Sequence, residues 1–343
     1  MNRTRSDNLL RTARFVAVLL LFAIPVVYLG IQRNYGVLQF AQLALDGLRG
    51  GAIYALIAMG FVMVFNVTGI INFAQGAFVM LGGMLTVTFY QMESSLPDRL
   101  HLIASAVLAV IITALIGLLI ERLTIYPARK SSTLTLIIIT VGVYIAMQGL
   151  GLLVWGAKAY VFPAFTTLAM TDHVFRWFGL VIKAQSFWIW GSMILVLVLL
   201  AYFFERTLLG KAMRACSVNR HGARLVGIGA ERMSLLAFGM AAAVGAIGGI
   251  VVSPILRPSY DMGLSLGLKG FVAAILGGLV STPGAVLGGL LLGFLENVAA
   301  GVTKAGMKDI YAFILLILTL LFRPQGLLGV GKTAVESSSE DQA

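Results

Sequence analysis

Long apolar runs separated by short polar stretches dominate this chain. Ten runs are candidate membrane spans, at residues 15–31, 43–65, 70–91, 101–120, 134–155, 186–204, 233–253, 268–280, 285–300 and 309–322. A helix crosses a bilayer with about 20 apolar residues, whereas a barrel strand shows only about ten in alternation. Because the runs are continuous, the pattern predicts an all-α membrane protein, a polytopic helical bundle of about ten spans that includes interrupted or short helices.

The composition supports a membrane location. Of 343 residues, 59% are hydrophobic and 11% are charged, whereas a soluble domain has roughly 25% charged residues. The 39 glycines are typical of close helix packing in lipid. Three pairs with small-xxx-small spacing, Gly245–Gly249, Gly284–Gly288 and Gly289–Gly293, are interpreted as packing positions within the chain or against a second subunit.

Lysine and arginine predict the orientation. With the N-terminus inside, the cytoplasmic segments hold fifteen of these residues and the opposite side holds eight. Cytoplasmic loops carry the excess of positive charge, so both termini are expected in the cytoplasm, as are residues 1–14 and the loop 205–232. The domain then covers residues 15–322, and the cytoplasmic tail 323–343 has a polar end that is expected to be disordered.

The first predicted span could also be a signal peptide. No small-x-small cleavage site follows Phe15–Leu29, which favours an uncleaved anchor. The long outer loop 156–185 has four tryptophans in or beside it, at positions 155, 177, 188 and 190. They are typical of an interfacial aromatic belt, and a docking surface for an external partner is the alternative.

Two segments interrupt the apolar pattern. Residues 66–76 place Asn72 and Gln75 between apolar runs, and residues 268–284 form a short stretch that ends in a Gly- and Pro-containing turn. Broken helices at membrane depth are tolerated where they face protein or a watery cavity, as at transporter binding sites. Asn72 and Gln75 are therefore candidates for the pathway of a polar or zwitterionic solute, with helix–helix hydrogen bonding or a helix cap as the alternative.

Few charged residues fall within the predicted spans. Asp46 and Arg49 are three positions apart and can meet on one helix face, so they are interpreted as a structural intramembrane pair close to the outer interface. Lys269 and Glu296 lie near predicted span ends, where snorkelling or interfacial hydration is the expected explanation.

The inventory of catalytic and metal-binding residues is poor. The histidines at 101, 173 and 221 are dispersed, and the single Cys216 excludes an intrachain disulfide and a Cys-rich metal site. No HExxH, G-x-S-x-G or Walker A motif occurs. The sequence predicts no catalytic residue, no metal site and no cofactor on this chain. The net charge of +11 lies in membrane-flanking loops, so it does not indicate a nucleic-acid partner.

The basic loop 205–232 is the most informative segment. Its lysine and arginine residues are explained by the positive-inside rule alone. That rule does not explain the apolar, Gly-containing stretch Ala223–Gly229 within it. A short helix that ends near Gly227 would present Leu225 and Val226 to another protein.

Several blocks of sequence, in one order, resemble a known family. They include G51-A-I-Y-A-L-I-A-M-G60, G69-I-I-N-F-A-Q-G76, E121-R122, G210-K-A-M-R-A215, A223-R-L-V-G-I228, G267-L-K-G-F-V-A-A-I-L-G-G278, S281-T-P-G-A-V-L-G-G289 and F322-R-P-Q-G326. With them, residues 45–329 resemble the inner-membrane permease subunits of bacterial ABC importers for branched-chain amino acids.

The resemblance implies a multi-pass transport subunit of the bacterial inner membrane and not an enzyme. Its expected partners are a second, non-identical permease subunit, two cytoplasmic ATPase subunits that hold the ATP, and an extracytoplasmic solute-binding protein. The resemblance also implies that Arg220, Ala223, Arg224 and Gly227 belong to the segment that couples the permease to the ATPase. ATP-driven closure of the motor would then move solute inward by alternating access.

The chain also departs from the family pattern. Gln75 stands where the family commonly has His, Tyr126 stands where it commonly has Arg, and Ser217–His221 replaces a stretch that usually carries acidic residues. Urea, amides or sugars are therefore alternative cargoes for the same machinery. A motor-independent channel or carrier is the alternative from a different class.

Overall fold

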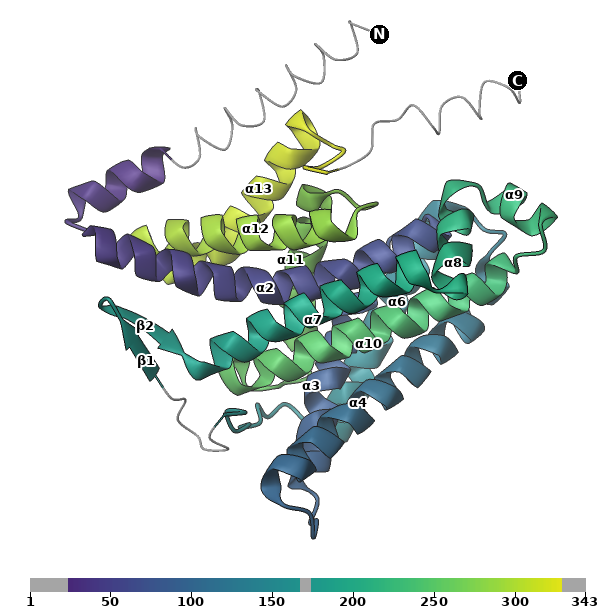
Figure 1. Cartoon of the computed structure of the whole chain (residues 1–343), viewed down its shortest axis with the longest axis horizontal. Coiled ribbons are helices and arrows are strands. Elements are labelled where there is room, and N and C mark those ends of the chain that lie inside the picture. Colours follow the sequence, from purple (N-terminus) through teal and green to yellow (C-terminus); the bar gives the residue numbers. More distant parts are fainter. Residues whose placement is uncertain (1–23, 167–173, 329–343) are drawn as a thin grey trace, which may run out of the picture.

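The computed structural model describes residues 24–166 and 174–328, which form a bundle of helices with one β-hairpin (Figure 1). Residues 24–32 are helical. The elements that follow are α2 (Val37–Thr68), α3 (Gln75–Gln91), α4 (Asp98–Ile120), the π-helix η1 (Glu121–Ile125), α5 (Tyr126–Ala128), α6 (Thr133–Trp155), β1 (Val174–Trp177), β2 (Leu180–Lys183), α7 (Ala184–Arg206), α8 (Leu208–Val218), α9 (Arg220–Leu225), α10 (Ala230–Leu256), α11 (Met262–Gly277), α12 (Thr282–Val302), the 3₁₀ turn η2 (Ala305–Met307) and α13 (Lys308–Phe322).

Seven helices in the described residues are long and apolar enough to cross a membrane. They are Val37–Thr68, Asp98–Ala128, Thr133–Trp155, Ala184–Arg206, Ala230–Leu256, Thr282–Val302 and Ala305–Phe322, and the shorter Met262–Gly277 is also apolar. The helical membrane architecture predicted from the sequence is confirmed. The first part of the predicted span 15–31 lies outside the described residues, as do residues 1–14 and the end of the tail.

The 32-residue helix α2 lies at the centre of the bundle. Its most apolar stretch is 83% buried, whereas the corresponding stretch of α6 is only 17% buried. Helices α3, α10, α11 and α12 surround α2 and share its core, while α4, α6, α7 and α13 lie at the periphery (Figure 1). The exposed apolar faces of these outer helices are suited to lipid or to a second subunit.

Glycine allows the central helices to approach closely. A Cβ atom at Gly249 of α10 would overlap the Val79 carbonyl of α3, and one at Gly293 of α12 would overlap the Gly51 backbone of α2. Gly288 and Gly289 are equally confined, by α11 and α2 respectively. The predicted packing role of the small-xxx-small positions is therefore confirmed within the chain.

The bundle has two opposite ends, and contacts between segments distant in sequence tie each of them together (Figure 1). At the first end, the Asn66 side chain donates to the Val280 carbonyl, and Arg129 pairs with Glu231. This end carries α8 and α9, and we call it the α9 end. At the other, which we call the hairpin end, the Tyr160 amide donates to the Pro258 carbonyl. Helix α2 runs from the hairpin to α8–α9.

The hairpin was not predicted from the sequence. Phe178 and Gly179 form its two-residue turn with φ of 46° and 79°, as a type I′ turn requires. The amide of Gln42 in α2 accepts from the Val181 N–H at 2.8 Å and donates to the Val181 carbonyl at 2.9 Å. It thus continues the hydrogen bonding of β2 and fixes the hairpin against the start of α2.

The expected short span at 268–280 has different limits. Helix α11 starts at Met262 and runs without a break to Gly277, so Lys269 lies inside the helix and not at its end. Beyond α13 the chain returns to this point, where the Leu327 and Leu328 amides donate to the Leu276 and Gly277 carbonyls. These bonds satisfy carbonyls that a helix end would otherwise leave free.

Candidate functional site at the α9 end

Helices α8 and α9 make up most of the loop predicted at 205–232. Both begin with a side-chain cap, because the Thr207 hydroxyl accepts from the Gly210 N–H at 3.0 Å and the Asn219 side chain accepts from the Gly222 N–H at 2.8 Å. Gly210 is required where α8 turns away from α7, since a Cβ there would overlap the Phe203 carbonyl. The local sequence therefore specifies two short, defined helices.

The end of α9 depends on Gly227. This residue has φ of +84°, the Ile228 amide donates to the Ala223 carbonyl at 2.9 Å, and the Gly227 amide donates to the Arg224 carbonyl at 3.1 Å. The pair of bonds is a Schellman motif, for which glycine is the preferred residue. A short helix that ends near Gly227 was predicted from the sequence, and the structure confirms it, with α9 ending at Leu225.

An apolar cluster lies beneath the two helices. Its buried members are Val67, Met213, Cys216, Ala223, Ala230, Met233 and Ala237. Burial raises the pKa of the Cys216 thiol, and nearby Arg220 and Arg224 oppose that effect. Because Val67 lies in the last turn of α2 and Ala230 begins α10, the cluster joins α8–α9 to two core helices.

The outer side of α9 is exposed and apolar. Leu225 is 89% exposed and Val226 is 76% exposed, at the end of the bundle that carries the basic residues Lys211, Arg214 and Arg224. Two large aliphatic side chains at the tip of a capped helix are unusual on a surface in contact with water. Their exposure is the arrangement expected from the sequence for a contact with another protein.

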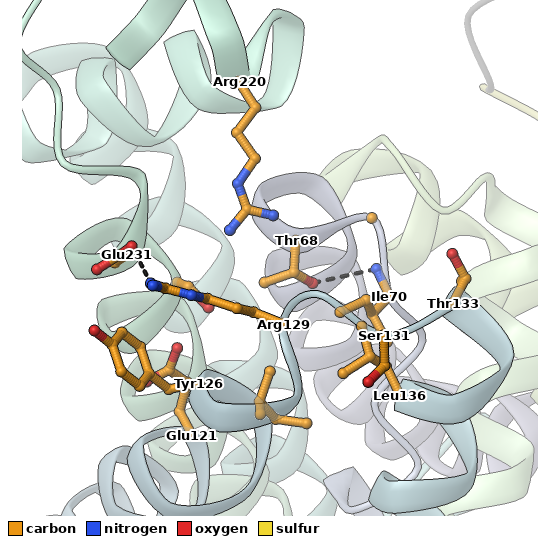
Figure 2. Close-up of a pocket in the computed structure, with 13 residues that line it drawn as sticks. Thr68, Ile70, Glu121, Tyr126, Arg129, Ser131, Thr133, Leu136, Arg220 and Glu231 are labelled. Atoms are coloured by element: carbon orange, nitrogen blue, oxygen red, sulfur yellow. Dashed lines mark hydrogen bonds and ion pairs between the residues drawn. The ribbon is translucent and has the colours of Figure 1, made fainter.

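A pocket of about 290 Å³ opens beside α9 (Figure 2). It is lined by residues from α2, η1, α5, α6, α9 and α10 and from their connections: Thr68, Gly69, Ile70, Glu121, Ile125, Tyr126, Arg129, Ser131, Thr133, Leu136, Arg220, Glu231 and Ser234. Of these, Arg220 was identified from the sequence as a coupling residue. The pocket itself was not predicted.

The charged groups of the pocket fall into two sets. Arg129 forms an ion pair with Glu231 and lies over the Tyr126 ring at 4.4 Å, with Arg122 also 4.2 Å from that ring. Glu121 and Arg220 take part in none of the four ion pairs found among the described residues. The pocket therefore holds one carboxylate and one guanidinium that are not neutralised by direct pairing.

Glu121 and Arg220 are held differently. The Glu121 residue is 3% exposed and accepts a hydrogen bond from the Ser234 hydroxyl. The Arg220 side chain extends from α9 into the pocket (Figure 2), and its buried Nε atom has no hydrogen-bond partner among the residues that the structure describes. An unpaired buried N–H costs free energy, so the Arg220 side chain can still gain a hydrogen bond from an occupant of the pocket.

Asn72 and Gln75 do not line this pocket and are fully buried at the break between α2 and α3. The Asn72 side chain accepts from the Ala74 amide at 3.1 Å, and the Gln75 side chain donates to the Ala241 carbonyl at 3.0 Å. Gly60 and Gly245 leave the space that the Gln75 side chain fills. Asn72 Nδ2 and Gln75 Oε1 remain buried without a hydrogen-bond partner in the described part of the chain.

Asp46 and Arg49 lie 3.1 Å apart on α2, and Gln42 also donates to the Asp46 carboxylate. This pair lies in the hairpin-end half of α2, whereas Asn72 and Gln75 lie beyond the opposite end of that helix.

Lys269 and Glu296 belong to a buried charged cluster that was not predicted from the sequence. The Lys269 ammonium is 2.8 Å from Glu296 and 2.8 Å from Asp309, and the Tyr54 hydroxyl donates to Glu296 at 3.3 Å. The Lys269 and Glu296 side chains are only 9% and 2% exposed. The expectation of snorkelling was wrong, because α11 begins before the apolar run and places Lys269 inside the bundle.

Comparisons with known proteins now decide the family. The family model described as branched-chain amino acid transport system / permease component matches residues 43–320. The chain belongs to this permease family. It is 36% identical over 300 residues to the high-affinity branched-chain amino acid transport system permease protein BraD of Pseudomonas aeruginosa, a match that covers 85% of this chain and 96% of that protein.

Two further relatives carry the name LivH. The high-affinity branched-chain amino acid transport system permease proteins LivH of Escherichia coli K12 and Salmonella typhimurium are each 33% identical, over 299 and 298 residues. Both matches cover 85% of this permease and 96% of the relative. The permease is thus a multi-pass membrane component of a transport complex and not an enzyme, and its family acts without a cofactor on the permease chain.

Proposed function

We propose that this permease carries branched-chain amino acids inward, as one subunit of an importer driven by separate ATPase chains. The proposal is supported by relatives that are named for this transport and are matched over nearly their whole length. It assumes about ten spans, with both termini and the α9 end in the cytoplasm. The excess of lysine and arginine at the α9 end supports this orientation.

The α8–α9 segment is the proposed site of coupling to the ATPase. One observation carries this assignment: a capped helix pair presents Leu225 and Val226 outward while its inner side is packed on α2 and α10. A push on α9 would reach both core helices through the apolar cluster. Ala223 supplies the inner contact, Arg224 lies on the exposed side, and Gly227 ends the helix.

The break at residues 69–74 is the proposed hinge of the solute pathway. Asn72 and Gln75 each keep one unpaired polar atom there, which costs free energy in this conformation. A rearrangement of α2 against α3 and α10 would allow both atoms to contact a polar solute or water. The other proposed partners are a second permease subunit against the exposed apolar helices and a solute-binding protein at the hairpin end.

A substitution at Gly227 tests the coupling. No atom of the described residues lies within 4 Å of a Cβ added at this position, so the main effect of Gly227→Val is expected through the positive φ, which β-branched residues strongly disfavour. In proteoliposomes that contain the whole complex, Gly227→Val should lower ATP-driven leucine uptake several-fold while ATP hydrolysis continues. Gly227→Asn is the matched control, because asparagine tolerates positive φ and should retain uptake.

The outcomes separate the alternatives. Normal uptake in Gly227→Val would refute the role of the α9 terminus in coupling. Leucine flux through the permease alone, without ATPase and ATP, would indicate a channel or carrier. Uptake of urea, an amide or a sugar in place of leucine would retain the machinery and change the cargo.

A further inference from the structure

The pocket beside α9 is lined by a carboxylate, a guanidinium and aliphatic side chains, and these three kinds of group together match a zwitterionic amino acid. We propose that it binds a free branched-chain amino acid from the α9 end, with the carboxylate on Arg220, the ammonium on Glu121 and the side chain against the aliphatic wall. This inference rests on the proposed function and adds a second site for the cargo, at the side where it is released.

The charge arrangement fits a zwitterion. Arg129 already neutralises Glu231, whereas Glu121 and Arg220 are one negative and one positive group that take part in no ion pair among the described residues. Guanidinium binds carboxylate with charge-assisted hydrogen bonds, and a buried carboxylate accepts them from an ammonium.

The size and the apolar wall restrict the ligand further. Ile70, Ile125 and Leu136 are 6%, 3% and 5% exposed and line the same pocket as the two charged groups. A volume of about 290 Å³ is at the small end of ligand pockets, which suits a single amino acid. The branched aliphatic wall favours a side chain such as that of leucine, isoleucine or valine.

Occupation of the pocket would restrain the coupling segment. Arg220 comes from α9, whereas Glu121 comes from η1 at the end of α4, so a zwitterion between them would tie α9 to the core (Figure 2). A ligand that binds one conformation more tightly shifts the equilibrium toward it. Amino acid that accumulates in the cytoplasm would thereby slow the movement of α9 and inhibit its own import.

Direct binding tests the site without the other subunits of the proposed complex. The intact permease in nanodiscs should bind radiolabelled leucine saturably. Leucinol, which lacks the carboxylate, and 4-methylpentanoate, which lacks the ammonium, should each compete at least tenfold more weakly than leucine. These probes leave the protein unchanged, so their result does not depend on whether a variant folds.

Substitutions in the pocket then test whether leucine binds there. Glu121→Gln, which is nearly isosteric, and Arg220→Lys, which keeps the charge but loses the planar fork, should each weaken leucine binding at least tenfold. Glu205→Gln is the matched control, since Glu205 is an exposed carboxylate at the same end and does not line the pocket. Leucine binding that survives both pocket variants, or competition by either analogue that is as strong as competition by leucine, would overturn the proposal.

The complete complex tests whether amino acid bound in the pocket inhibits import. In proteoliposomes with a leucine-loaded binding protein outside, leucine on the α9 side should inhibit ATP hydrolysis at least twofold, and Glu121→Gln should abolish this inhibition. A complex that imports leucine while the permease binds none at this end would refute the pocket alone. A complex that imports no branched-chain amino acid would refute the proposed function, and the pocket assignment with it.

Discussion

Removal of Lys269 should destabilise this permease strongly. Its ammonium lies between Glu296 and Asp309 at 2.8 Å from each, and it is within 5.5 Å of the Tyr54 ring centre. Lys269→Met would leave the Glu296 carboxylate, only 2% exposed, without its cation. Truncation of one partner of a buried ion pair costs about 3–5 kcal/mol, because the remaining charge stays buried and uncompensated.

The neighbouring groups supply matched controls. Asp309 contacts the same ammonium but its side chain is 62% exposed, so Asp309→Asn should cost less than about 1 kcal/mol. The double variant Lys269→Met with Glu296→Gln removes both buried charges and should recover most of the stability lost in Lys269→Met. The two substitutions are therefore expected to be strongly non-additive.

Thermal unfolding of the purified permease in nanodiscs gives the measurement. Lys269→Met should lower the Tm by several degrees more than Asp309→Asn does, and the double variant should lie closer to the wild type. If Lys269→Met were as stable as the wild type, or if the two substitutions were additive, Lys269 and Glu296 would be hydrated and the buried ion pair refuted.

Two further predictions concern packing. Burial raises the pKa of the Cys216 thiol above its ordinary value near 9, so the reactive thiolate is scarce and alkylation should stay slow as the pH rises to 9. The exposed position 217 supplies the control, since Ser217→Cys in a Cys216→Ser chain should react readily. Fast labelling of Cys216 at neutral pH would contradict the packing of α8. Gly249→Val should prevent the assembly of α10 against α3 and lower the yield of folded protein. Gly142→Ala should leave that yield unchanged, because no atom of the described residues lies within 4 Å of a Cβ added there. Equal yields from the two variants would show that Gly249 is not a contact point.

Continuous apolar runs specify most of this fold. They predicted the helices of the bundle because every backbone group must be satisfied inside the bilayer, which only helices achieve within a single segment. Helix ends were less accurate, since hydropathy locates the apolar centre of a helix and not its caps. Helix α11 begins six residues before the predicted span, at Met262, and this difference moves Lys269 from an end to the interior.

The candidate site likewise shows which features the sequence can predict and which depend on packing between distant segments. Gly227 and the apolar tip of α9 could be predicted because their signal is local in sequence. The pocket joins Glu121 and Arg220, which are far apart in the chain and become neighbours only through the packing of α9 onto the core. The pair E121-R122 was visible as part of a family block, but its connection to α9 had no sequence signal. The hairpin turn at Phe178 and Gly179 was missed because its strands are only four residues each.

The most direct test of the proposed coupling is the accessibility of the α9 tip. Leu225→Cys in a Cys216→Ser chain places a thiol at a position that is 89% exposed in the isolated permease. A membrane-impermeant maleimide should label it in inside-out vesicles, and binding of the partner ATPase should block the labelling. Labelling from the opposite side of the membrane, or labelling that the ATPase leaves unchanged, would contradict the assignment of α9 as the surface held by the motor.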